Sequence, residues 1–307
     1  MTSEQSFAFN QTVPLWGFYA FDAYIIIFMV ITGIIFWWSI ARKKERPPEK
    51  FKLLRGPGET QRRRVQKADE NLFSYFYGGA FVPLVIVSLV LLLATQLPKG
   101  LVLVGAAVAA VLFFVSTVCA IVVLLRFLNR RRNDLLSYLG ERAVAEYLEP
   151  LRQNGFRIFH DVPCEGRKTN FNIDHVVVGP TGVAAIEVKT RRKKKGRPGF
   201  EEHVVTHDGQ RLIWPWGEDR CGIDQLMAES DWLRKFIYGR TGLHVDPKPI
   251  LALPGWWVTE RVAGAFRVSS HKLLPAIIRD WKPQPLTPEQ IDLISRQLDE
   301  RCRDVED

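Results

Sequence analysis

The 307-residue sequence lacks the features that mark several common classes of protein. Its four cysteines, Cys119, Cys164, Cys221 and Cys302, form no Cys-x-x-Cys pair, and no histidine lies near them at the spacing of a zinc site. The sequence also contains no glycine-rich phosphate-binding loop and no Gly-x-Ser-x-Gly turn. We therefore expect neither disulfides nor structural zinc, and this cysteine content agrees with a reducing compartment.

Basic residues are missing from the N-terminal end. The first 41 residues contain no lysine or arginine, whereas eleven such residues lie between Arg42 and Lys67. A cleavable signal peptide begins with positive charge, so this segment does not fit one. Because basic loops stay on the cytoplasmic side of a membrane, we expect a cytoplasmic loop over 42–76 and an N-terminus outside. This loop is expected to contact anionic lipid headgroups, with nucleic acid as the alternative partner.

Three long apolar stretches precede residue 130, at about 23–40, 80–97 and 101–125. Each approaches or exceeds the roughly 20 residues that cross a hydrocarbon core. We predict three transmembrane helices within residues 1–129, embedded in a prokaryotic plasma (inner) membrane. Three crossings place everything after Arg126 on the cytoplasmic side. The stretches hold few polar side chains, which argues against a channel, and their glycines permit packing against a second copy.

A hairpin is the clearest local prediction, and it lies within residues 172–190. Two runs rich in β-branched residues flank the sequence Gly-Pro-Thr-Gly at 179–182, which is typical of a tight turn between strands. We expect Pro180 and Thr181 to be the two loop residues. A slip of one residue would move every side chain to the other face of the sheet.

This register gathers three charged residues. It sets Asp174 opposite Glu187, and the two-residue period of a strand puts Lys189 on the same face. Two carboxylates about 4 Å apart repel by roughly 4 kcal/mol at an effective dielectric near 20, so such a pair calls for a cation. Mg²⁺, or Mn²⁺ in its place, suits oxygen ligands and substrate phosphate. The cluster therefore predicts metal-dependent hydrolysis of a phosphodiester.

These residues resemble a known signature. Asp174 followed by Glu187-Val188-Lys189 is similar to the D...(D/E)xK motif of the restriction-endonuclease-like superfamily. Across about residues 137–278 the chain resembles, more narrowly, the NERD (nuclease-related) domain, through Gly140-Glu141, residues 173–178 and residues 182–189. The resemblance implies a mixed sheet flanked by helices, which we assign to residues 130–285, followed by a C-terminal helix at 286–307.

The resemblance also implies roles for individual residues. Asp174 and Glu187 would bind the metal, with the carbonyl of Val188 as a further ligand. Lys189 would be the catalytic lysine. Glu141 resembles an additional acid of the family, and Gln225 resembles a glutamine that supports the site in the superfamily.

Simpler explanations exist for each of these residues. The Asp174, Glu187 and Lys189 group could be a solvated cross-strand cluster. Glu141 could be a first-turn acid that interacts with the dipole of a helix beginning there. Gln225 could lie on the polar face of an amphipathic helix. His175 should point away from Asp174, as a packed or hydrogen-bonded imidazole.

A dense basic run follows the lysine of the motif. Residues 130–307 hold 29 Lys and Arg against 26 Asp and Glu, so this half of the chain is only weakly basic overall. Its positive charge is concentrated in Arg191, Arg192, Lys193, Lys194, Lys195 and Arg197. We predict that these residues bind the phosphates of a nucleic acid; a solvated loop is the alternative.

The remaining sequence alternates strand and helix signals. Expected elements are a helix at 141–154, a strand at 156–160, a hairpin around 207–210, a helix at 223–238, strands at 249–253 and 265–268, a helix at 271–280, and a last helix capped by Thr287. The leading hypothesis is a membrane-anchored nuclease acting on DNA, or less readily RNA. The alternative is a catalytically silent scaffold that binds nucleic acid or protein through a nuclease-like fold.

Overall fold

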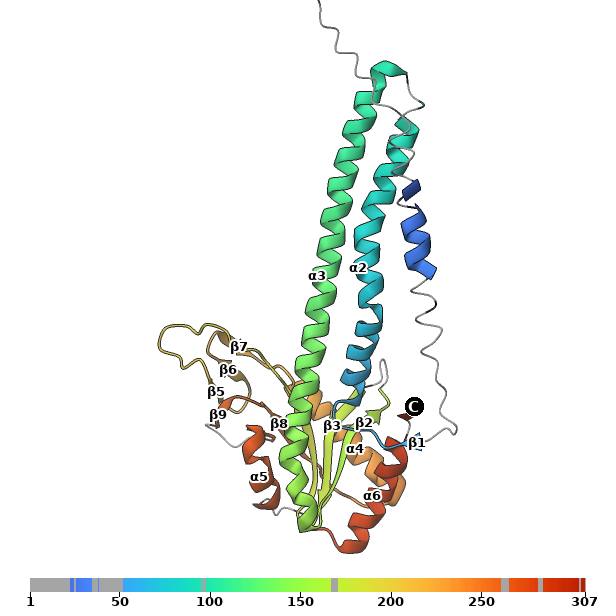
Figure 1. The fold of residues 1–307 in the computed structure, drawn as a ribbon. Helices are drawn as coiled ribbons and strands as arrows, with labels where there is room; N and C mark the ends of the chain where they lie inside the picture. The colour runs from blue at the N-terminus through green and yellow to red at the C-terminus, as the bar shows by residue number, and fades with distance from the viewer. Residues whose placement is uncertain are drawn as a thin grey trace, which may run out of the picture. The chain divides into compact units, whose positions relative to one another are not determined.

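A computed structural model describes residues 23, 24, 26–34, 38, 52–94, 96, 98–166, 171–260, 265–280, 284–303 and 305–306. The chain divides into two compact units, residues 1–48 with 72–125, and residues 49–71 with 126–307. Helices α2 (Glu59–Ala94) and α3 (Val102–Leu148) contribute residues to both units (Figure 1).

The first unit contains the apolar helices. Within the described residues, two helices are long and apolar enough to cross a membrane: α2, and α3 continued by the 3-10 turn η2 (Glu149–Asn154). The short 3-10 turn η1 (Lys99–Leu101) joins them. This finding corrects the expected three spans to two. Of the predicted first span, 23–40, residues 23, 24, 26–34 and 38 are helical, and the others lie outside the described residues.

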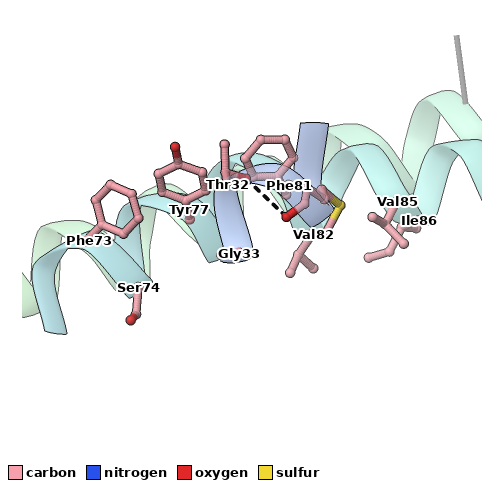
Figure 2. Close-up of a pocket in the computed structure, with 11 residues that line it drawn as sticks. Thr32, Gly33, Phe73, Ser74, Tyr77, Phe81, Val82, Val85 and Ile86 are labelled. Carbon is pink, nitrogen blue, oxygen red and sulfur yellow. Dashed lines mark hydrogen bonds between the residues drawn. The ribbon is translucent and has the colours of Figure 1, made fainter. Parts of the chain in front are cut away.

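An open cavity of about 410 Å³ lies within this first unit. Figure 2 shows Thr32 and Gly33 facing a row of side chains that includes Phe73, Tyr77 and Phe81. The hydroxyl of Thr32 donates a 2.7 Å hydrogen bond to the carbonyl of Phe28, so it is already satisfied. None of the described residues that line the cavity carries a charge at neutral pH.

The second unit is built on a five-stranded mixed sheet, which confirms the predicted α/β architecture. Its strand order is β10-β8-β4-β3-β2. The pairs β10–β8 and β8–β4 are parallel, and the pairs β4–β3 and β3–β2 are antiparallel. The strands are β2 (Arg157–Cys164), β3 (Phe171–Gly179), β4 (Gly182–Val188), β8 (Lys248–Ala252) and β10 (Arg267–Ser269). Nearly all residues of β3, β4 and β8 are buried, because helices cover both faces.

Helices lie on both faces of the sheet (Figure 1), and two apolar clusters hold them to it. On one face, the end of α3 and α5 (Leu274–Asp280), which follows the 3-10 turn η3 (His271–Leu273), pack on the strands through residues such as Leu148 and Ile278. On the other face, α4 (Ile223–Thr241) and α6 (Pro288–Cys302) pack through residues such as Leu233 and Leu298. At the predicted start of the last helix, Thr287 and Gln290 form a reciprocal capping box, which confirms that prediction.

A second, four-stranded sheet has the order β7-β6-β5-β9. Its strands are β5 (Val204–His207), β6 (Leu212–Trp214), β7 (Gly217–Asp219) and β9 (Trp257–Glu260). The predicted hairpin around 207–210 joins β5 to β6, and Asp208 Oδ1 accepts the backbone N–H groups of Gln210 and Arg211. Strands β7 and β9 were not predicted from the sequence. A third cluster, with Trp214 and Trp256 buried in it, joins this sheet to α4 and β8.

Helix α3 differs from the prediction at its C-terminal end. We expected a helix to begin at Gly140-Glu141, but α3 runs without a break from Val102 to Leu148. Gly140 has a different role, because a Cβ atom at this position would lie 2.0 Å from Oγ1 of Thr190. The glycine therefore lets α3 approach the segment that follows β4.

The segment before α2 also differs from the loop that we expected over 42–76. It pairs β1 (Lys52–Leu53) with β11 (Val305–Glu306), and Arg55 forms a 2.9 Å ion pair with Asp161 of β2. The backbone N–H and the hydroxyl of Thr60 donate to the same Asp161 oxygen at 3.0 and 2.8 Å. Asp161 adopts a φ of 49°, which is uncommon for a residue with a side chain. These contacts make residues 52–60 part of the second unit.

Candidate functional site

The central hairpin has the predicted register. Gly179 pairs with Gly182, so Pro180 and Thr181 are the two loop residues, and pairing continues to His175 with Ile186. The next position in this register sets Asp174 across from Glu187. On the other side of β3, the pairs His160 with His175 and Val162 with Ile173 set Asp161 across from Asp174. Three adjacent strands therefore each place one carboxylate in a single row.

Asp174 lies at the centre of this row. Its side chain is buried, and its Oδ2 accepts a 2.7 Å hydrogen bond from the backbone N–H of Val188. Burial, followed by the charge of Glu187, raises the pKa of Asp174 well above its usual range, although the Val188 hydrogen bond opposes this shift. The carbonyl of Val188 stays a predicted ligand.

Glu187 is even more enclosed, with 1% of the residue exposed. Its Oε1 accepts a hydrogen bond from the Lys189 ammonium, whereas its Oε2 has no hydrogen-bond partner within the described chain. Burial, followed by the charge of Glu229, raises the pKa of Glu187 to about 8. A carboxylate in this setting favours either a proton or a cation.

Lys189 follows β4 and is fixed at both ends. Its backbone N–H donates to the carbonyl of Ala252 at 2.9 Å, and its Nζ donates to Glu187 and, at 2.9 Å, to Oε1 of Gln225. Burial alone would lower the pKa of Lys189, but the carboxylate of Glu187 outweighs it, and the pKa is raised. The structure therefore presents a charged ammonium beside the carboxylate row.

Glu141 reaches the same site from α3. It is buried, and Oε2 of its carboxyl has no hydrogen-bond partner among the described residues. Burial, followed by the charges of Asp174 and Asp161, raises its pKa to about 10. Glu141 lies deep within α3, so a role as a first-turn acid is ruled out. Its role toward a metal stays a prediction.

Helix α4 supplies two further side chains. Gln225 holds Lys189 through its Oε1, and its Nε2 donates a 2.7 Å hydrogen bond to Oε1 of Glu229. Glu229 is fully buried, and burial, followed by the charge of Asp174, raises its pKa to about 8. Lys189, Gln225 and Glu229 therefore form one hydrogen-bonded chain, so Gln225 is more than a residue on a polar helix face.

Glu229 and Asp161 were missed by the sequence analysis. Glu229 follows Gln225 by four residues, which places both side chains on one face of a helix, and this spacing could have identified it. Asp161 joins the site because β2 pairs with β3. The sequence alone does not give the register of this pair, because no turn motif defines the connection between the two strands. Short-range patterns therefore could not identify Asp161.

His175 points to the opposite face of β3, as predicted. Its Nδ1 lies 2.8 Å from Nδ1 of His160, and both imidazoles are buried. Burial is the main cause that lowers the pKa of each ring, to about 4 for His160. The pair is thus a hydrogen-bonded core contact between neutral rings, away from the carboxylate row.

The basic run of residues 191–197 contacts neighbouring residues, although most of its charged side chains are exposed to solvent. Cations from this run lie over aromatic rings, at 5.0 Å for Arg191 over Trp214 and 4.5 Å for Arg197 over Phe200. Arg191 also forms a 2.8 Å ion pair with Asp219. The other contacts are Arg192 with Asn133 at 3.0 Å, Lys193 over Trp256 at 5.8 Å and Lys194 over Trp216 at 5.7 Å.

The donor set fits a hard divalent cation. The site consists of buried carboxyl groups with raised pKa, and some of their oxygens have no hydrogen-bond partner within the described chain. An Mg²⁺ ion would neutralise the repulsion between these carboxylates. Across the described ranges, no group of three or more His, Cys, Asp or Glu side chains is arranged to hold a metal. This geometry still suits Mg²⁺, because that ion commonly uses one or two carboxylates and takes water and phosphate oxygens for the rest.

Comparison with known families agrees with this geometry. Residues 136–254 match the family model described as the nuclease-related domain, NERD. No curated protein sequence and no solved structure matches the chain. The matched segment starts before Glu141 and extends beyond Ala252, so it spans the carboxylate row, Lys189 and Gln225. Residues 136–254 of this chain therefore belong to the nuclease-related domain family.

Proposed function

We propose that this chain is a membrane-anchored nuclease that depends on Mg²⁺ or Mn²⁺ and hydrolyses phosphodiester bonds of DNA, and less readily of RNA. One observation carries the proposal. Asp174 and Glu187 face each other on adjacent buried strands, and the ammonium of Lys189 contacts the second carboxylate. A row of buried carboxylates is costly to maintain without a cation, and the membership in a nuclease-related family gives it a chemical purpose.

Asp174 and Glu187 would hold the metal ion. When bound, the ion would supply a Lewis acid that neutralises charge on the scissile phosphate. The Val188 N–H fixes one oxygen of Asp174, which leaves the other oxygen to face the site. The unpartnered Oε2 of Glu187 is a second available donor.

Lys189 would act on the attacking water and on the phosphate. Its ammonium can orient the water oxygen toward phosphorus and stabilise the negative charge that develops as the new P–O bond forms and the bond to the leaving oxygen breaks. Gln225 and Glu229 would keep this ammonium in place through the chain of 2.9 and 2.7 Å hydrogen bonds. Such positioning lowers the barrier because the group needs no rearrangement during the reaction.

The apolar helices support membrane attachment. α2 and α3 each contain a long apolar stretch in which only 6% of the residues are buried, which suits contact with lipid. The basic residues before and within the start of α2, together with Arg130, Arg131 and Arg132, would hold the second unit on the cytoplasmic side. The location is a prokaryotic plasma membrane in this proposal.

A catalytically silent scaffold is the second candidate. It is favoured by the contact between Lys189 and Glu187, which partly neutralises the row without a metal. Such a protein would bind nucleic acid or protein through the nuclease fold without cleavage.

A cleavage assay separates the two functions. The full chain, purified in detergent micelles, is incubated with linear and circular DNA and with RNA in Mg²⁺, in Mn²⁺ or in EDTA. We expect cleavage only with a divalent ion, and its loss in Lys189→Met and Asp174→Asn. Lys272→Ala, which changes an exposed lysine on η3, is the matched control and should keep full activity. Absence of products with every substrate, or cleavage unchanged by Lys189→Met, would reject the nuclease.

A further inference from the structure

Three tryptophans hold the basic run in place. Trp214 and Trp216 stack with ring centroids 5.5 Å apart and planes 13° apart, and Trp256 meets both edge-on at 5.1 and 5.5 Å. We call these residues the tryptophan triad. Lys193 and Lys194 lie over rings of the triad while remaining exposed to solvent. One side of each cation therefore faces an aromatic ring, and the other side is open to a ligand.

The backbone of this segment is fixed as well. The N–H of Arg197 donates to the carbonyl of Pro215 at 2.9 Å, and Nε1 of Trp256 approaches the carbonyl of Arg191 at 3.3 Å. A Cβ atom at Gly196 would lie 3.1 Å from Cβ of Pro215, so the chain passes tightly over the second sheet. The positive charges thus follow Lys189 along a defined path, which reduces the entropy lost when they bind a phosphate chain.

Two large aromatic side chains near this segment are left in solvent. Trp257 is 69% exposed and Phe200 is 45% exposed, whereas Trp214 and Trp256 are at most 3% exposed. Trp257 begins β9, pairs with Val204 at the start of β5, and donates its backbone N–H to His203 at 3.0 Å. Phe200 lies just before the same end of β5. Both rings therefore belong to one end of the second sheet.

We infer that this end of the second sheet, with Lys193, Lys194, Phe200 and Trp257, binds single-stranded nucleic acid and leads it toward Lys189. This inference rests on the proposed function and specifies its substrate. Lysines that keep one side open suit phosphates, and exposed rings suit unpaired bases, which offer their faces for stacking. A duplex already buries those faces between base pairs, so exposed rings give it no comparable contact. Charge and ring exposure together favour a single strand.

Binding is measured without cleavage, which separates this inference from the nuclease proposal. The full chain in detergent micelles is titrated, in EDTA, into a fluorescein-labelled single-stranded 20-mer and into the matching duplex. We expect tighter binding of the single strand. The double variant Phe200→Ala with Trp257→Ala should weaken it at least fivefold for each ring removed. The variant Lys193→Ala with Lys194→Ala should weaken it and reduce its salt dependence.

Matched controls test the location of the surface. Tyr238→Ala removes a 52% exposed ring from α4, and Lys272→Ala removes an exposed lysine from η3; neither should change binding. Equal loss for these controls and the double variants, or equal affinity for strand and duplex, would overturn the inference. A membrane location of Trp257 would also overturn it. This location would appear as quenching of tryptophan fluorescence by brominated anionic lipids in nanodiscs that is lost in Trp257→Phe. Specific binding without any cleavage in Mg²⁺ or Mn²⁺ would uphold the surface and reject the nuclease.

Discussion

Gly140 and Thr190 are packed so closely that no side chain fits between α3 and the segment after β4. An added Cβ atom at Gly140 would lie 2.0 Å from Oγ1 and 3.1 Å from Cβ of Thr190. The residue that follows Gly140 is the buried acid Glu141, and the residue before Thr190 is Lys189. This contact therefore sets the approach of the helix acid to the carboxylate row.

The first prediction concerns this contact. Gly140→Ala should lower the free energy of unfolding by about 1–3 kcal/mol, because the overlap outweighs the better helix propensity of alanine. Thr190→Ala alone should cost little, since the buried hydroxyl of Thr190 has no hydrogen-bond partner within the described residues. Combined with Gly140→Ala, it should restore much of the lost stability. Thermal unfolding of the four proteins measures this cycle, and additive effects would contradict the close packing.

The second prediction concerns pH and metal. Folding raises the pKa of Glu187 and of Glu229 from 4.5 to about 8, so the folded state holds these protons more tightly than the unfolded chain. Their contribution to stability is fully present below pH 4.5 and is lost as the pH rises through about 8. Without metal, the melting temperature should therefore fall between pH 6 and pH 9. Mg²⁺ should raise it more at pH 9 than at pH 6, because the ion replaces the lost protons.

Neutral substitutions provide the control for this titration. Glu187→Gln should flatten the fall in melting temperature with pH and remove most of the stabilisation by Mg²⁺. Asp231→Asn changes a partly exposed acid of α4 that is paired with Lys235, and it should leave both effects unchanged. A pH dependence that is identical in Glu187→Gln and the unchanged protein would assign the titration to other groups.

The local parts of the site were predictable from sequence, and the long-range parts were not. The turn at 179–182 dictates the hairpin register, so the meeting of Asp174 with Glu187 could be derived from about 20 residues. Gln225 was found through family resemblance alone, and its partner Glu229 was missed. Asp161 is part of the carboxylate row because β2 pairs with β3, and no short-range sequence pattern specifies this pairing.

The helix boundary at residue 141 was predicted wrongly for a related reason. We expected a helix to begin at Glu141, after Gly140, but α3 continues through both residues. The glycine is needed for contact with Thr190, which only the folded structure reveals. Similarly, we expected residues 52–60 to be part of a loop, yet Asp161, a residue 101 positions beyond Thr60, holds this segment in place.

The third prediction tests the hydrogen-bonded chain behind Lys189. Gln225→Ala removes the acceptor at 2.9 Å from Nζ and should reduce kcat by about 10- to 100-fold with a smaller change in KM, since a hydrogen bond to a charged group contributes about 1.5–3 kcal/mol. Gln225→Glu keeps an acceptor for Lys189 but cannot donate to Glu229, so it should recover only part of the rate. Steady-state kinetics with Mg²⁺ measure the split. An unchanged kcat for Gln225→Ala would show that Lys189 needs no such support.

The fourth prediction concerns the ion pair between Arg55 and Asp161. Only 11% of the Arg55 side chain and 2% of the Asp161 side chain are exposed, so solvent screens the pair little. Arg55→Ala should reduce the free energy of unfolding by about 3 kcal/mol, because it leaves a buried carboxylate without its charged partner. Arg296→Ala breaks an exposed pair with Asp292 and should cost less than about 1 kcal/mol.

Chemical denaturation of both arginine variants measures the difference, and limited proteolysis identifies the segment that is released. If residues 52–60 are part of the nuclease-related unit, Arg55→Ala should expose the chain before α2 to cleavage, whereas Arg296→Ala should not. Because Asp161 is across from Asp174 in the sheet, the loss of the Arg55 charge should also strengthen the stabilisation by Mg²⁺. Equal stability and equal protease resistance of the two variants would mean that the segment before α2 only rests on the domain. Loss of stability with an unchanged Mg²⁺ effect would instead separate the Arg55 contact from the metal site.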